Sequence, residues 1–161
     1  MKWKKVLLGI AAVLTTLAGG YQANEMFGAV NGRGNYSERT VLDAVVAGTT
    51  STPFGVADFQ FLGWTVTTAA TTATIRFACS MSETAPNFSG SRSSTNRWDY
   101  VDVTDLQNDN SIDGSVGIAF TNSTTIRQLQ MEAVPFRWCV SILSDWTSGT
   151  TTVKLLTANN N

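Results

Sequence analysis

The sequence contains no histidine, only two cysteines and three prolines, and few charged residues, which make up 14% of the chain. Without an imidazole there is no Ser-His-Asp or Cys-His nucleophile and no histidine zinc site, and two distant cysteines cannot form a four-thiolate site. Paired carboxylates are the only common catalytic machinery that remains. The residue types present therefore predict a protein that is not an enzyme.

Carboxylates are concentrated in one stretch, which contains Asp99, Asp102, Asp105, Asp109 and Asp113. A glycosidase needs two such groups on either side of one sugar bond. The three-residue spacing between Asp99 and Asp102 places them on opposite sides of a strand, and acids beside turns are usually only solvated. We therefore predict no catalytic residue.

Positive charge is scarce beyond the first five residues. Residues 21–161 hold seven arginines and one lysine, Lys154, against twelve acids, and no basic cluster is present. Phosphate backbones are bound by concentrated basic surface, so the sequence predicts no nucleic-acid partner.

The first twenty residues, MKWKKVLLGIAAVLTTLAGG, combine lysines with an uncharged apolar run at 6–17. As a helix this run would rise about 18 Å, against a hydrocarbon core of about 30 Å, so a signal peptide is favoured over a full span. Ala18 and Gly20 supply the small residues needed for a cut before Tyr21. If uncleaved, residues 1–20 would anchor the chain in a membrane or against neighbouring subunits. The protein is predicted to be exported, to the extracellular space, the cell envelope surface or a virion.

Residues 21–161 are rich in threonine, serine, asparagine and glycine and poor in strong helix formers. Threonine is β-branched and fits a pleated, half-solvated surface. About 140 residues suffice for one domain with a substantial core. This composition predicts an all-β fold with a single domain.

Short alternating segments separated by turn clusters predict a β-sandwich of about eight strands, with jelly-roll or Ig-like connections. The domain is expected at 39–157, after a flexible linker or extended arm at 21–38 and before a polar tail at 158–161. The predicted strands are 39–47, 59–68, 72–81, 98–106, 115–121, 125–134, 136–143 and 150–157. The predicted core comprises Val45, Phe61, Trp64, Ile75, Phe77, Val101, Ile118, Leu129, Trp138, Val140, Ile142 and Leu155.

The two cysteines, Cys79 and Cys139, would usually form a disulfide in an exported protein. Strand parity argues against this pairing. Cys79 shares a face with the apolar Ile75 and Phe77, whereas Cys139 lies opposite the face that carries Trp138. Parity thus predicts two unpaired, partly buried thiols, unless a bulge realigns one of the strands.

The segment Asp-Asn-Ser-Ile-Asp-Gly at 109–114 resembles the opening of a calcium loop, with oxygen ligands at Asp109, Ser111 and Asp113 and a glycine at the sixth position. The twelfth position is Phe120 and not a bidentate glutamate. The same residues are those that an ordinary turn requires. No cofactor is predicted, and Ca²⁺ is the single ion that the pattern would suit.

Aromatic and basic residues give the candidate binding surface. Trp98 and Tyr100 share one face of a predicted strand, and Trp146 lies in a predicted turn without apolar neighbours, so these three rings are available to stack on sugars or contact proteins. Arg92 and Arg97 belong to a long polar loop that leads into that strand, where partner contacts tend to lie.

Two functions fit these observations. The first is a structural subunit of an extracellular or virion surface assembly, with itself or neighbouring structural subunits as partners. The hydroxyl-rich strand at 150–157 carries few charges that would block edge pairing. The alternative is a secreted carbohydrate-binding or adhesion module that binds glycans.

Overall fold

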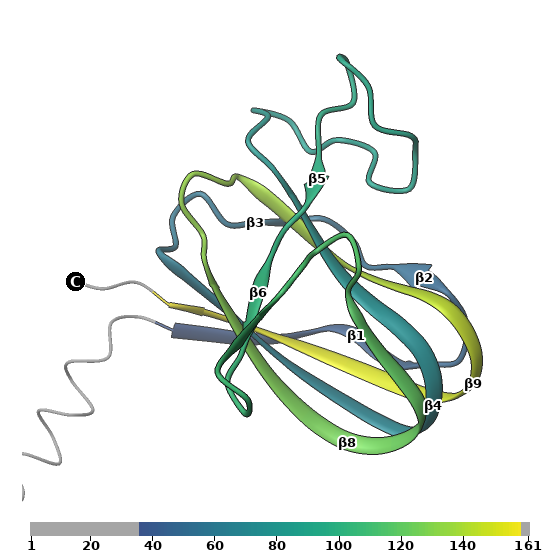
Figure 1. Cartoon of the computed structure of the whole chain (residues 1–161). Coiled ribbons are helices and arrows are strands. Elements are labelled where there is room, and N and C mark those ends of the chain that lie inside the picture. Colours follow the sequence, from purple (N-terminus) through teal and green to yellow (C-terminus); the bar gives the residue numbers. More distant parts are fainter. Residues whose placement is uncertain (1–35, 159–161) are drawn as a thin grey trace, which may run out of the picture. The chain divides into compact units, whose positions relative to one another are not determined.

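The structure is a computed structural model that describes residues 36–158, and in that range it is all-β with no helix. Its nine strands form one antiparallel sheet in the order β1-β9-β4-β8-β6-β7, with β2 and β3 paired to β9 and β5 paired to β4 (Figure 1). The strands are β1 (Tyr36–Val45), β2 (Thr49–Thr50), β3 (Phe54–Gly55), β4 (Phe61–Ser80), β5 (Asp99–Tyr100), β6 (Val103–Asp105), β7 (Asn110–Ile112), β8 (Ile118–Glu132) and β9 (Trp138–Ala158).

Three long neighbouring strands, β4, β8 and β9, curve together and fold the sheet back on itself (Figure 1). The fold-back is clearest within β4, where the rings of Trp64 and Phe77 pack with their centroids 4.4 Å apart. Fully extended, the strand between them would span about 43 Å. The predicted sandwich is therefore present, and its two layers are joined by continuous strands.

Six of the predicted strands are in fact three. The pairs 59–68 with 72–81, 115–121 with 125–134, and 136–143 with 150–157 each correspond to one long strand, β4, β8 and β9. The interruptions that resemble turns in the sequence are bulges, marked by register shifts and by positive φ angles at Ala70 (48°), Asn122 (45°) and Asp145 (52°). A bulge and a turn need similar small or polar residues, which explains the error.

Threonine hydroxyls replace the hydrogen bonds that these bulges interrupt. The N–H of Ala70 donates to Thr124 Oγ1 at 2.9 Å, and the N–H of Asn122 donates to Thr72 Oγ1 at 2.9 Å. In β1 the N–H of Ala44, another residue with positive φ, donates to a threonine Oγ1 of β9 at 3.0 Å. An unpaired backbone donor is costly, so the threonine content directly supports the bend.

The core lies between the two layers. Of the twelve predicted core residues, seven are buried, namely Trp64, Ile75, Phe77, Val101, Leu129, Val140 and Leu155. Val45, Ile118, Trp138 and Ile142 are partly buried. Phe61 was predicted wrongly: it is 36% exposed, because the inward residues of this part of β4 are the even-numbered Leu62, Trp64 and Val66.

The described strands extend slightly beyond the predicted domain at both ends. β1 begins at Tyr36, inside the predicted arm, and β9 ends at Ala158, inside the predicted tail, and these two residues pair. The predicted leader at 1–20 lies outside the described residues. Within residues 36–158 no helix is long and apolar enough to cross a membrane.

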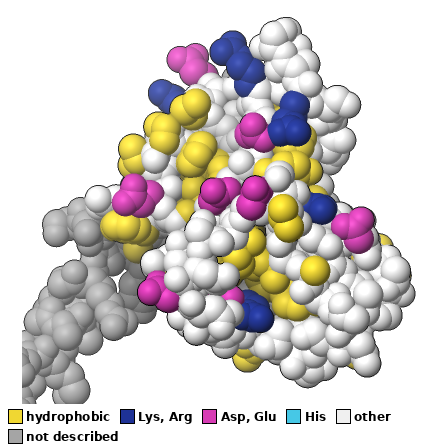
Figure 2. Space-filling model, viewed as in Figure 1, with side chains coloured by type: hydrophobic (Ala, Val, Ile, Leu, Met, Phe, Trp, Pro, Cys, Tyr) yellow, Lys and Arg dark blue, Asp and Glu magenta, His cyan; other side chains and the backbone are white. Residues whose placement is uncertain are grey.

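The face shown in Figure 2 carries Lys and Arg side chains dispersed singly among acidic ones, without a continuous basic area. Several charged side chains among the described residues form ion pairs. Lys154 pairs with Glu38 at 2.9 Å, and Arg127 pairs with the buried Asp105 at 2.7 Å.

Candidate binding site

The segment 81–98 between β4 and β5, here called the projecting loop, extends beyond the sheet (Figure 1). It is organised around the side chain of Asn96. The Oδ1 atom of Asn96 accepts from the N–H of Asn87 at 2.8 Å, and its Nδ2 donates to the carbonyls of Asn87 and Ser91, both at 2.9 Å. Three bonds from one amide hold two distant parts of the loop together, so the loop has a defined conformation.

Arg92 lies over two aromatic rings at the base of the projecting loop. Its Cζ is 5.7 Å from the ring centroid of Trp98 and 5.5 Å from that of Tyr100. The two rings meet edge to face with centroids 5.5 Å apart, and Phe88 packs against Trp98 at 5.8 Å. Arg92 also forms an ion pair with Asp99. These cation–π and aromatic contacts close the loop onto the strand that follows it.

The projecting loop covers the second face of the sheet. Phe88 is buried there with Ala78 and Val140, and Trp98, Tyr100, Trp138 and Ile142 pack against them. The indole Nε1 of Trp138 donates to the carbonyl of Glu83 at 3.3 Å. Apolar side chains on both faces of β9 are therefore buried at this end of the sheet, one set in the main core and one under the loop.

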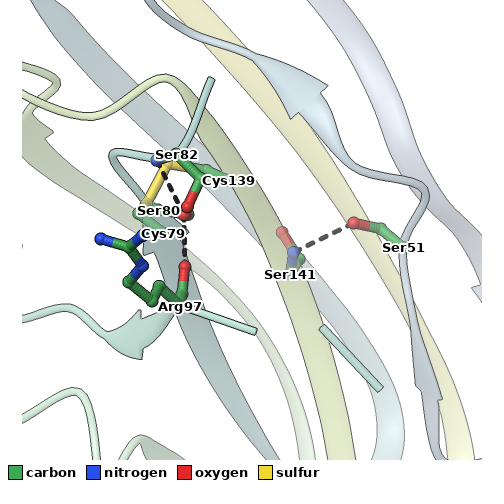
Figure 3. The surroundings of a disulfide bond; sticks show 7 residues. All are labelled: Ser51, Cys79, Ser80, Ser82, Arg97, Cys139 and Ser141. Carbon is green, nitrogen blue, oxygen red and sulfur yellow. Dashed lines mark hydrogen bonds between the residues drawn. A yellow bond between two sulfur atoms is a disulfide. The ribbon is translucent and has the colours of Figure 1, made fainter. Parts of the chain in front are cut away.

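A disulfide joins Cys79 of β4 to Cys139 of β9 beside the base of the loop (Figure 3). The two residues are direct partners across the strands, with a Cα–Cα distance of 4.1 Å. The parity prediction of unpaired thiols is therefore wrong. Its error was the assumption that Trp138 faces the main core, whereas Cys139 and Leu143 face that core and Trp138 lies under the loop.

Ser80, next to the disulfide, fastens both ends of the projecting loop (Figure 3). Its hydroxyl donates to the carbonyl of Arg97 and accepts from the N–H of Ser82 at 3.1 Å. The N–H of Arg137 donates to the carbonyl of Ser80 at 2.8 Å. One residue thus connects the loop to the sheet and to the start of β9.

Two open concavities flank Arg92 and Trp98, which line both. The larger, of about 1010 Å³, is lined by Cys79, Ser80, Met81, Ser82, Glu83, Thr84, Arg92, Ser93, Thr95, Asn96, Arg97, Trp98, Asp99 and Phe136. The smaller, of about 520 Å³, is lined by Thr50, Phe88, Ser89, Gly90, Ser91, Arg92, Trp98, Tyr100 and Ile142. Sites for small molecules usually measure about 300–1,000 Å³, so each is large enough for a ligand.

The structure brings together four of the five predicted binding residues. Arg92, Trp98 and Tyr100 form one cluster, and Arg97 lines the larger concavity beside them. Trp146 is separate. It lies within β9 and not in a turn, it packs against the main core, and its Nε1 donates to the carbonyl of Gly149 at 3.1 Å. The prediction that Trp146 lacks apolar neighbours is wrong.

The predicted calcium ligands lie along the β6–β7 hairpin. Ser111 is in β7, and the strand separates Asp109 from Asp113. Asp113 accepts from the hydroxyl of Ser115 at 2.6 Å and from its N–H at 2.7 Å. Both bonds lower the pKa of the Asp113 carboxyl, and the bond from the hydroxyl contributes more. Among residues 36–158, no three or more Cys, Asp or Glu side chains are grouped so that they could hold a metal ion.

The other acids of this region hold the backbone in place. Asp99 accepts from the N–H of Tyr100 at 2.8 Å, in addition to its ion pair. Asp102 accepts from the N–H of Gly114 at 2.9 Å. Asp105 is buried and accepts from the N–H of Gln107 and from the side chain of Asn108, both at 2.9 Å. Each carboxylate thus has a structural partner.

Sequence reasoning missed three contributors to this region: Phe88, Asn96 and the disulfide. Phe88 is the one large apolar residue at 82–97, which is a usable signal that this segment packs against another part of the protein. Asn96 gave no signal, because its role depends on contacts with residues up to nine positions away.

Comparison of the sequence with protein-family models finds no match, and comparison with curated proteins finds none either. Solved structures with a similar fold include the SPBc2 prophage-derived protein YomS, at 14% identity and a TM-score of 0.57, over 78% of this chain and 94% of that one. The PBSX exported protein XepA matches at 12% identity and a TM-score of 0.56, over 78% of this chain and 38% of its own length. At these identities the likeness establishes a shared fold.

Proposed function

We propose that the chain is a non-enzymatic structural subunit of an extracellular or virion surface assembly. The observation that carries the proposal is the fold, which is shared over 78% of the chain with a prophage-derived protein and over 78% with a protein described as exported. In this proposal the β-sandwich is exposed, and residues 1–20 are removed on export or anchor the chain.

The disulfide supports export. Disulfides form and persist in oxidising compartments and are rare in the cytosol. Cys79 and Cys139 are both buried, at 2% and 0% exposure, so the bond has a structural role in the folded protein. The acids that a carboxylate enzyme would use are engaged with backbone or arginine partners, which supports a non-enzymatic role.

The open sheet edges support assembly, although the edge expected from the sequence is not one of them. The segment 150–157 belongs to β9, which pairs with β1 on one side and β4 on the other, so it is not an edge. The edge strand β1 carries Glu38, Arg39 and Asp43. One edge of β8 pairs with β4. Along the other edge, the described strands supply a partner only at Leu129 and Gln130, which pair with β6. Residues 118–126 of β8 carry no charge, and uncharged edges are those that pair with other chains.

Sedimentation of the full chain without detergent at micromolar concentration tests the proposal. We expect multimers, and we expect Thr121→Lys, which places a charge on the open part of β8, to reduce them. Thr40→Lys on the already charged β1 is the matched control and should assemble normally. A monomeric chain that retains Met1, confirmed by mass spectrometry, would contradict the assembly role, and normal assembly of the Thr121 variant would contradict pairing through β8.

A further inference from the structure

We propose that the larger concavity beside the projecting loop is a binding site for neutral oligosaccharides. This inference goes beyond an assembly role, because it assigns a ligand to a surface that assembly through β8 does not use. It stands on three features of the loop: its fixed conformation, the side chains that line the concavity, and the balance of charge there.

The first feature is preorganisation. The Asn96 amide, the Ser80 hydroxyl and the stacking of Arg92 on two rings fix the loop from three directions. A site that is already ordered does not lose further conformational entropy when its ligand binds, which favours affinity. A long loop that only connected two strands would not need this set of contacts.

The second feature is the lining. Six of the fourteen lining side chains carry a hydroxyl or an amide, Ser82, Thr84, Ser93 and Thr95 among them, and Trp98 and Phe136 add half-buried aromatic surface. Sugars present hydroxyl groups that donate and accept hydrogen bonds, and C–H faces that pack on aromatic rings. A protein partner would instead call for a buried apolar centre, and this concavity is open and mixed in polarity.

The third feature is charge. Four charged residues line the concavity, Arg92 and Arg97 against Glu83 and Asp99, and Arg92 is already paired with Asp99. The formal charges balance, so a strongly anionic ligand would gain little and would meet two carboxylates. Arg97 is exposed and makes no ion pair with another described residue, so its guanidinium can donate to sugar hydroxyls.

A glycan array that carries neutral and acidic oligosaccharides tests this inference with the full chain. We expect neutral glycans to be bound. For the glycan that binds most tightly, Arg97→Ala should raise the dissociation constant about tenfold in titration calorimetry, because a charged hydrogen bond is lost. The substitution spares the Arg97 carbonyl that receives the Ser80 hydroxyl, so the loop should stay folded. Arg137→Ala is the matched control, since Arg137 is exposed at the same end of the sheet and lines neither concavity.

Three results would each overturn the inference: no binding to any glycan on the array, preference for acidic glycans, or equal affinities of the Arg97 and Arg137 variants. The outcome is separate from that of the assembly test. A monomer that binds glycans would contradict the structural-subunit proposal alone, whereas a multimer that binds none would contradict the glycan site alone.

Discussion

The bend in the middle of the β4–β9 pair and the disulfide-linked end of the pair are held by different chemistry. At the bend, around Ala70 and Ser148, the side chains are small or hydroxylated, and hydroxyls from neighbouring strands replace lost backbone bonds. At the disulfide-linked end, Cys79 and Cys139 are covalently joined, and hydrophobic clusters cover both faces of the sheet. The contrast indicates that weak local bonds suffice where a strand changes direction, whereas the end that carries the projecting loop is made rigid.

The largest expected effect is at the rigid end. Replacing both Cys79 and Cys139 with alanine opens a loop of 60 residues, and the chain-entropy model gives a loss of about 4 kcal/mol in the free energy of unfolding. Urea unfolding of the variant against the oxidised protein measures this loss. A change below about 1 kcal/mol would mean that the two hydrophobic clusters hold this end without the covalent bond.

At the bend the largest effect should come from Gly149→Ala. Gly149 has a φ of +80°, and a Cβ there would lie 2.4 Å from the carbonyl oxygen of Ala70, a backbone atom that cannot easily move. We expect a loss of about 1–3 kcal/mol in the free energy of unfolding.

Gly48→Ala is the matched control for this substitution. Its nearest neighbour, the Leu143 carbonyl oxygen, is 3.4 Å from the added Cβ, and no positive φ is involved. Equal midpoints for the Gly48 and Gly149 variants in urea would show that the bend tolerates a side chain.

A smaller effect is expected from one hydroxyl of the bend. Thr124→Val leaves the N–H of Ala70 without its acceptor, which should cost about 1 kcal/mol. Thr124→Ser keeps the hydroxyl and should restore most of the stability, as measured by thermal and urea unfolding. Wild-type stability of the valine variant would show that the hydrogen bond to Ala70 does not contribute, because valine keeps the methyl group and loses only the hydroxyl.

The smallest effect concerns the acid dependence of the bend. The hydroxyl of Ser144, followed by that of Thr74 and by Arg76, lowers the pKa of the Asp145 carboxyl from its ordinary value of 3.8. A carboxyl with a lowered pKa in the folded state stabilises the protein above pH 3.8, and that contribution is lost as the pH falls through the lowered pKa. Between pH 5 and pH 2.5, the melting temperature of the Asp145→Asn variant should therefore fall less than that of the wild type. The difference should be about a few degrees or less. An identical acid profile for both proteins would contradict this role.

The all-β class and much of the core could be predicted from the sequence, because alternation in segments such as the one around Trp64 reports directly which side chains point inward. The bend could not. Alanine, threonine and asparagine at 69–72 and 121–124 suit a hairpin turn as well as a bulge, and the choice depends on whether hydroxyls of adjacent strands are in reach.

The candidate site was partly predictable for a similar reason. Trp98 and Tyr100 are two residues apart in a segment predicted to be extended, so parity alone places them on one face. The position of Arg92 over both rings depends on the path of the whole loop. The disulfide was mispredicted because β9 is apolar on both faces near Cys139. In a strand that is buried on both faces, the alternation of apolar and polar residues does not show which face points to the core.

The continuity of β4, β8 and β9 across the bend also affects how the domain unfolds. Neither layer is attached through a flexible hinge, so one cannot open while the other stays folded without breaking all three strands in their middles. Backbone amides near Trp64 in one layer and Phe77 in the other should then exchange with deuterium through the same global opening. Despite its two layers, the sandwich would behave as a single cooperative unit.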